Sequence, residues 1–83
     1  MNWDYKLAHQ VVKNLKRLPR KDQERIIATL EEMKVNPFSG DLRLMQGESN
    51  LYRRRVGNYR IYFRPYLAKR LLDIPEITRK RSN

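Results

Sequence analysis

The sequence predicts an α+β fold in which an N-terminal strand and a helical hairpin pack on one face of a small antiparallel sheet, in the order β-α-α-β-β-β. Three observations lead to this prediction. Residues 7–36 carry two apolar stripes at helical spacing, separated at Pro19. Residues 51–64 form two alternating runs around Gly57-Asn58, a favoured two-residue hairpin loop. The length of 83 residues fits one domain, which we expect to span residues 1–83.

The N-terminal half accounts for the first strand and the two helices. Segment Asn2–Lys6 alternates aromatic and polar residues, which predicts a short strand with Trp3 and Tyr5 facing the core. Pro19 then separates two predicted helices, which join around residues 18–20. Their apolar stripes consist of Leu7, Val11, Leu15 and Leu18 in the first, and of Ile26, Ile27, Leu30 and Met33 in the second.

The C-terminal half contains the remaining strands. Turn-forming residues are dense in Asn36–Asp41, which predicts the end of the second helix, and a short strand is expected over Leu42–Met45. After the hairpin, residues 65–70 are expected to form a loop, residues 71–77 the last strand and residues 78–83 a basic tail. Pro75 has no N–H to donate, so we expect it at a sheet edge or a bulge.

The Gly57-Asn58 loop also predicts the register of the hairpin. Val56 should pair with Tyr59, and Arg55 with Arg60. Because side chains alternate along a strand, two sets should face in opposite directions. The set expected to pack on the helices is Tyr52, Arg54, Val56, Tyr59, Ile61 and Phe63, with Arg54 reaching solvent from the edge of the core. The outward set is Arg53, Arg55, Arg60, Tyr62 and Arg64.

The charge of the chain indicates a polyanionic partner. Lys and Arg number 19 against 9 Asp and Glu, giving a net charge of +10. This excess predicts binding to nucleic acid, an anionic membrane or an acidic protein. Arg55 and Arg60 would repel each other unless an anion lay between them, and guanidinium groups grip phosphate with two hydrogen bonds. Tyr62 could stack on a base. The alternative is a solvated face whose charge prevents aggregation.

Other features narrow the possibilities. There is no cysteine, which excludes disulfides and cysteine-ligated metal. No apolar run reaches membrane-spanning length and the N-terminus lacks the apolar segment of a signal peptide, so we expect a cytoplasmic protein without a membrane partner. His9, the single histidine, is expected to be an ordinary helix residue. We expect no metal site and no cofactor.

Over nearly its whole length the chain resembles the RelE/ParE superfamily of bacterial toxins from toxin–antitoxin modules. The likeness is carried by "LKRLPRKDQERI", "NPFSGDLRLMQG", "YRRRVGNYRIYF" and "LDIPEITR". The resemblance implies a RelE-type toxin that enters the ribosomal A site and cuts mRNA there without a metal, the RNA's 2′-hydroxyl attacking the neighbouring phosphate. It also implies an antitoxin partner that covers the basic surface, in addition to the ribosome and mRNA.

The resemblance assigns catalytic roles to Arg53, Arg55, Arg60 and Arg79, whose charges would stabilise the negative charge that builds on the phosphate. Further RNA contacts are expected at Tyr62, Arg64, Lys80 and Arg81. Many RelE-type toxins carry a tyrosine close to the C-terminus, whereas this sequence has none after Tyr66. Two alternatives therefore stay open: a ParE-like toxin that poisons DNA gyrase without cutting RNA, and an inactive RNA-binding relative.

Overall fold

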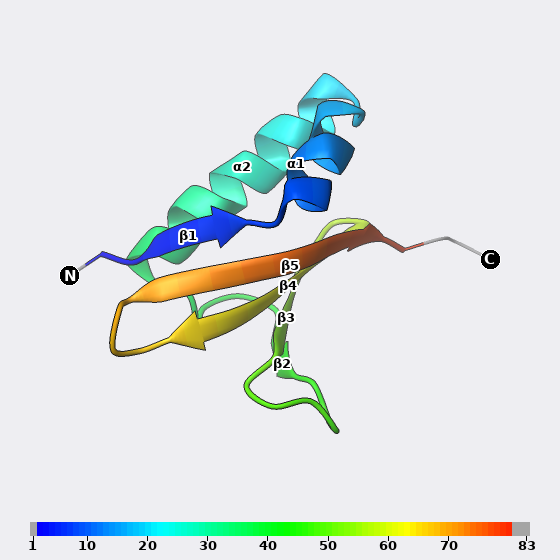
Figure 1. Ribbon diagram of the computed structural model, residues 1–83. Helices are drawn as coiled ribbons and strands as arrows, with labels where there is room; N and C mark the ends of the chain where they lie inside the picture. The colour runs from blue at the N-terminus through cyan, green and yellow to red at the C-terminus, as the bar shows by residue number, and fades with distance from the viewer. Residues whose placement is uncertain (1, 81–83) are drawn as a thin grey trace.

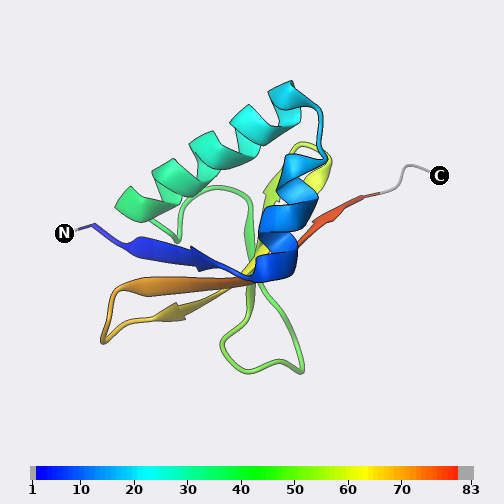
Figure 2. The same cartoon turned by 45° about the horizontal axis from the view of Figure 1, so that its top comes forward.

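A computed structural model describes residues 2–80, in which two helices and five strands are present. The elements are β1 (Asp4–Leu7), α1 (His9–Lys16), α2 (Arg20–Val35), β2 (Leu42–Leu44), β3 (Tyr52–Val56), β4 (Tyr59–Tyr66) and β5 (Leu71–Arg79). The strands form one sheet in the order β1-β5-β4-β3-β2, and both helices cover the same face of it (Figure 1, Figure 2). The predicted α+β class, with a helical hairpin on one face, is confirmed.

The prediction of an antiparallel sheet with the N-terminal strand on its face was wrong in this detail. The sheet is mixed, because β1 joins it as an edge strand parallel to β5. Asp4–Leu7 pairs with Leu71–Ile74, while the other three strand pairs are antiparallel. The helical hairpin carries the chain across one face from β1 at one edge to β2 at the other (Figure 1). The first and last strands of the chain are therefore neighbours.

The core lies between the helices and the face of the sheet that they cover. It consists of Trp3 before β1, of Ile26, Leu30 and Met33 from α2, and of Tyr59, Ile61, Phe63, Leu72 and Ile74 from β4 and β5. Trp3 is buried as expected. Tyr5 is half-buried at the margin, and its hydroxyl donates to Oε2 of Glu31 at 3.3 Å. An apolar stripe from one helix and alternate positions from two strands thus meet in one layer.

The β3–β4 hairpin has the predicted register. Arg55 lies opposite Arg60, and Val56 opposite Tyr59. Gly57 adopts a φ of +55°, in the left-handed region that favours glycine. Along β4 the alternate residues from Tyr59 to Pro65 are buried and those between them are half-buried, so the two faces differ as the pattern predicts.

β4 is longer than expected, because it continues through Pro65 and Tyr66, which we had placed in a loop. β3 begins opposite Phe63, so Pro65 lies beyond the end of β3 and its missing N–H costs no hydrogen bond to that strand. On the side of β4 where β3 has ended, the Nδ2 of Asn50 donates to the carbonyl of Pro65 at 2.7 Å.

β5 is also longer, since it extends to Arg79 and takes in two residues expected in the tail. β4 starts directly after a tight turn and so offers Tyr59 as a partner for Arg79. The N–H of Lys80 then donates to the carbonyl of Asn58 at 2.6 Å. Pro75 lies at a bulge, as predicted, because the register of β4 with β5 shifts between Tyr62 and Arg64.

Arg54 is buried, and the expectation that it would reach solvent was wrong. The residue is 7% exposed, since β3 lies between β4 and β2 and contacts α2 on its covered face. The guanidinium group lies where a Cβ on Gly40 would be, and its Nη2 donates to Oε1 of Glu32 at 3.2 Å. The Nε and Nη1 of Arg54 have no hydrogen-bond partner among residues 2–80. The loop glycine therefore makes room for a buried cation.

Candidate functional site

The face of the sheet opposite the helices, here called the open face, carries the basic side chains. No helix among the described residues covers it (Figure 1). Strand register assigns to it Arg43 of β2, Arg53 and Arg55 of β3, Arg60, Tyr62 and Arg64 of β4, Asp73, Glu76 and Thr78 of β5, and Asp4 and Lys6 of β1. The structure therefore brings together the predicted residues of the hairpin.

Two rows of paired residues cross the open face. In one row Arg55 lies opposite Arg60, and Arg60 lies opposite Thr78. In the next row Arg53 lies between Arg43 and Tyr62, and Tyr62 lies opposite Glu76. Because neighbouring strands are about 4.8 Å apart, the side chains of each row are within reach of one another.

Four of these arginines have no acidic partner within residues 2–80. The ion pairs found within residues 2–80 join Lys34 to Glu31, Arg54 to Glu32 and Arg64 to Glu48. None of them involves Arg43, Arg53, Arg55 or Arg60. In addition, the Nε of Arg60 is buried without a hydrogen-bond partner in the described part of the chain. A cluster of arginines without internal neutralisation is suited to bind an external anion.

Arg64 differs from the other arginines of the open face, because it is already engaged. Its Nη2 lies 3.5 Å from Oε2 of Glu48, and its Nε donates to the carbonyl of Ser49 at 3.3 Å. Its charge is therefore partly neutralised by the turn before β3. Arg43 lies on the edge strand β2, so Arg53, Arg55 and Arg60 form the central group of cations.

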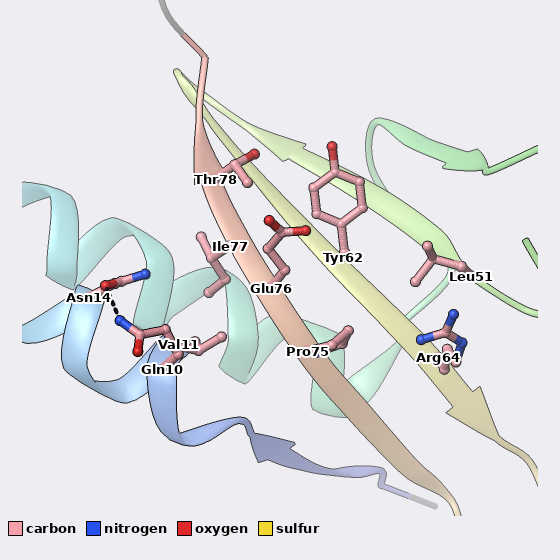
Figure 3. Close-up of a pocket in the computed structure, with 10 residues that line it drawn as sticks. All are labelled: Gln10, Val11, Asn14, Leu51, Tyr62, Arg64, Pro75, Glu76, Ile77 and Thr78. Carbon is pink, nitrogen blue, oxygen red and sulfur yellow. Dashed lines mark hydrogen bonds between the residues drawn. The ribbon is translucent and has the colours of Figure 1, made fainter.

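A hollow of about 640 Å³ lies beside this group, within the size range of sites for small ligands. Tyr62 and Arg64 line it from β4, residues 75–78 from β5, and Gln10 and Asn14 from α1. Figure 3 shows Glu76 and Thr78 on β5 beside Tyr62 on β4. The hollow is therefore lined by an aromatic ring, a carboxylate and a hydroxyl group, and it lies next to the arginines.

The structure does not bring Arg79 to the open face. Arg79 pairs with Tyr59, which faces the helices, and its guanidinium lies 5.9 Å from the centre of the Tyr59 ring. It borders a smaller cavity of about 190 Å³ between α1 and the end of β5. Lys80 is exposed just beyond β5, and Arg81 lies outside the described residues. The predicted set of four arginines is therefore divided, with three on one face and one on the other.

Tyr59 links the sheet to the helical hairpin. Its hydroxyl donates to Oδ2 of Asp22, in the first turn of α2, at 2.7 Å. This hydrogen bond and then burial raise the pKa of Tyr59 above its usual value, while the nearby Arg79 acts in the opposite direction. The contact holds α2 against the strand that carries Arg60.

Among the residues of the open face that the sequence reasoning missed, Arg43 and Glu76 bear on the site. Arg43 extends the basic row, and the alternation of Leu42-Arg43-Leu44 was the available signal. Glu76 was not among the predicted site residues, and it lies opposite Tyr62. Its position depends on the bulge in β5, which shifts the pairing between the strands. The sequence carries no strong signal for the extent of that shift.

Within residues 2–80, none of the helices has the length and apolar character needed to cross a membrane. No group of three or more histidine, aspartate or glutamate side chains gathers there in a way that could hold a metal ion.

Comparisons with known proteins agree with the fold. Residues 5–82 match a family profile described as ParE toxin of type II toxin-antitoxin system, parDE. A relative from Methanocaldococcus jannaschii, provisionally named as a RelE toxin, is 26% identical over 83 residues, which cover 96% of this chain and 92% of the relative.

Solved structures give the same result. The archaeal RelE–RelB complex from Pyrococcus horikoshii matches with a TM-score of 0.85 and 24% identity over 100% of both chains. The RelB–RelE complex from Methanococcus jannaschii matches with a TM-score of 0.71 and 28% identity, covering 88% of this chain and 87% of that one. Both relatives were crystallised with an antitoxin. The family profile matches nearly the whole sequence, so this chain belongs to the RelE/ParE family of toxins from type II toxin–antitoxin systems.

Proposed function

We propose that this toxin inhibits translation by cutting mRNA in the ribosomal A site. The observation that carries the proposal is the position of Arg53, Arg55 and Arg60 side by side on the open face, without acidic partners among the described residues. An uncovered cluster of three guanidinium groups is a phosphate-binding arrangement. The crystallised relatives pair with RelB antitoxins, and we propose a cognate antitoxin for this chain as well.

The chemistry requires charge stabilisation more than covalent participation by the protein. Attack of a 2′-hydroxyl on the adjacent phosphorus builds negative charge on the phosphate oxygens in the transition state. Guanidinium groups held in place before the reaction stabilise that charge more than they stabilise the substrate. Removal of one such donor is expected to lower the rate about a hundred- to a thousandfold.

The other predicted site residues have supporting roles in the proposal. Tyr62 lies between Arg53 and Glu76, where it can stack on a base next to the cleaved phosphate. Arg64, Lys80 and Arg81 would contact the RNA or ribosome backbone at the margins. Arg79 is separated from the open face, so we propose that it contributes to binding rather than to the chemical step.

Expression without the antitoxin tests the proposal in cells. We expect growth arrest in which loss of protein synthesis precedes any loss of DNA supercoiling, because the target is mRNA on the ribosome. Pulse labelling and plasmid topology, followed in the same culture, measure the order of events.

The second candidate function is poisoning of DNA gyrase, and it is favoured by the ParE description of the matching family profile. Purified toxin incubated with gyrase, or with ribosomes carrying a defined mRNA, separates the two functions directly. Inhibition of supercoiling with intact mRNA would favour gyrase. Cleavage of the mRNA that is lost in Arg53→Ala would support the ribosomal target, because Arg53 is on the open face and has no described structural partner.

A further inference from the structure

The proposed cleavage needs a group that accepts the proton of the attacking 2′-hydroxyl. The arginines of the open face cannot do so, since a guanidinium group stays protonated in proteins. A carboxylate is the remaining common acceptor on this face. Strand register assigns three to it, namely Asp4 of β1 and Asp73 and Glu76 of β5.

Position distinguishes Glu76 from the other two carboxylates. Asp73 lies between Lys6 and Arg64 in the paired strands, and Asp4 lies on the edge strand far from the hairpin turn. Glu76 lies opposite Tyr62, which is itself opposite Arg53. Two residues further along β5, Thr78 lies opposite Arg60. Glu76 is therefore the carboxylate that shares the row of Arg53 and lies next to the row of Arg55 and Arg60.

The spacing of the strands leaves room for a phosphate group between Glu76 and the arginines. β3 and β5 are two strands apart, roughly 10 Å, with Tyr62 and Arg60 of β4 between them. Long side chains from both sides can converge above β4. Glu76 is exposed, borders the hollow and has no ion-pair or hydrogen-bond partner for its carboxylate within residues 2–80 (Figure 3).

We infer that Glu76 is the general base of the cleavage reaction, an inference that rests on the proposed function. Its carboxylate takes the proton from the 2′-hydroxyl as the bond from O2′ to phosphorus forms. The bond from phosphorus to O5′ breaks, its electron pair stays on O5′, and that oxygen takes a proton from water. The products are a 2′,3′-cyclic phosphate and a 5′-hydroxyl, and the guanidinium groups keep their protons throughout.

A matched pair of variants tests this role in single-turnover cleavage of mRNA on programmed ribosomes. Glu76→Gln keeps the size of the side chain but removes the proton acceptor, so the rate should fall about a hundred- to ten-thousandfold. Asp73→Asn makes the same change in charge on the same strand and face and should stay within about threefold of the unchanged protein. Ribosome affinity and thermal midpoint should be similar in all three proteins, which keeps binding and folding apart from the chemical step.

Two further readouts exclude a merely electrostatic effect. Between about pH 7 and 9 the unchanged protein should cleave at a nearly constant rate, whereas the residual rate of Glu76→Gln should rise toward tenfold per pH unit as hydroxide replaces the base. Added formate should restore part of the activity of Glu76→Ala. Equal rates in Glu76→Gln and the unchanged protein, or equal losses in Glu76→Gln and Asp73→Asn, would overturn the inference.

A substrate with a 2′-deoxy nucleotide at the cleavage position separates failure of this inference from failure of the proposed function. If the unchanged toxin does not cut ordinary mRNA, or cuts the deoxy substrate equally well, the proposed function and the role of Glu76 both fall. If ordinary mRNA is cut, the deoxy substrate is resistant and Glu76→Gln retains full rate, the role of Glu76 alone falls.

Discussion

At the scale of single residues, neighbours along β4 have opposite roles because the strand alternates. Ile61 is fully buried in the core, whereas Arg60 next to it lies on the open face opposite Arg55. Two guanidinium groups in direct cross-strand register repel each other. The protein keeps this unfavourable pair at the place where the proposed function needs positive charge, as is usual for sites that bind or transform anions.

Substitution of Arg60 should therefore separate cleavage from folding. Arg60→Ala relieves repulsion and removes a buried Nε that lacks a partner in the described chain, so stability should change by no more than about 0.5 kcal/mol. Cleavage on ribosomes should fall about a hundred- to a thousandfold. The control is Ile61→Ala, which should lower the free energy of unfolding by about 2–5 kcal/mol by leaving a cavity. Unfolding by Arg60→Ala with tolerance of Ile61→Ala would reverse the assignment of the two faces.

Tyr59 predicts a loss of stability in alkali. The pKa of Tyr59 is raised by its hydrogen bond to Asp22 and by burial, whereas an unfolded tyrosine ionises near pH 10. Above that pH the folded chain holds a proton that the unfolded chain has lost, so stability falls as pH rises through the folded pKa. Tyr59→Phe should cost about 1–3 kcal/mol at neutral pH and should flatten the decline above about pH 10. Urea unfolding at several pH values measures both effects. If the free energy of unfolding fell equally steeply with pH above about pH 10 in both proteins, the argument would be contradicted.

The face on which a side chain lies could be predicted from the sequence where one tight turn sets the strand pairing. The Gly57-Asn58 loop sets the pairing of β3 with β4, so Arg53, Arg55 and Arg60 could be assigned to one face in advance. Arg79 and Glu76 depend on the pairing of β4 with β5, which a bulge shifts. The alternating sequences of β4 and β5 do not show at which residue their register shifts.

At the scale of elements, local signals account for the helices and the hairpin. Pro19 separates α1 from α2, and the apolar stripe of α2 faces the core as predicted at Ile26, Leu30 and Met33, whereas Ile27 is exposed. The parallel pairing of β1 with β5 has no comparable signal, because it joins segments at opposite ends of the chain. The burial of Arg54 was missed for a similar reason, since it depends on Gly40 in a loop that returns to cover β3.

The stability of the protein should be sensitive to the addition of a single methyl group at Gly40. Gly40 has a φ of +82°, and an added Cβ would overlap the guanidinium group of the buried Arg54. Gly47 has a φ of +77° but open space around it, so Gly47→Ala isolates the backbone effect of about 1–2 kcal/mol. Gly40→Ala should cost roughly 2–4 kcal/mol in total, because the guanidinium must also move away from Glu32. Similar thermal midpoints for both variants would show that Arg54 moves without cost.

At the scale of the whole molecule, the two faces of the sheet have different roles. The covered face supplies the apolar residues that pack under the helices, and the open face carries part of the excess charge that gives the chain its net +10. Self-repulsion of this kind lowers the stability of the free protein. Any polyanion that binds only the folded chain, whether RNA or an acidic antitoxin segment, would offset that loss by mass action.

The place of β5 in the sheet has a consequence for synthesis. Of the described strands β5 is translated last, yet it lies between β1 and β4 and supplies Leu72 and Ile74 to the core. While residues 71–79 are still inside the ribosome, β1 has no neighbouring strand. We therefore expect the nascent chain to be cut by protease until that segment emerges. Stalled chains of increasing length would show the step, and protection before β5 emerges would contradict it. If this toxin acts on ribosomes as proposed, it would gain its active form only after residues 71–79 have left the ribosome that makes it.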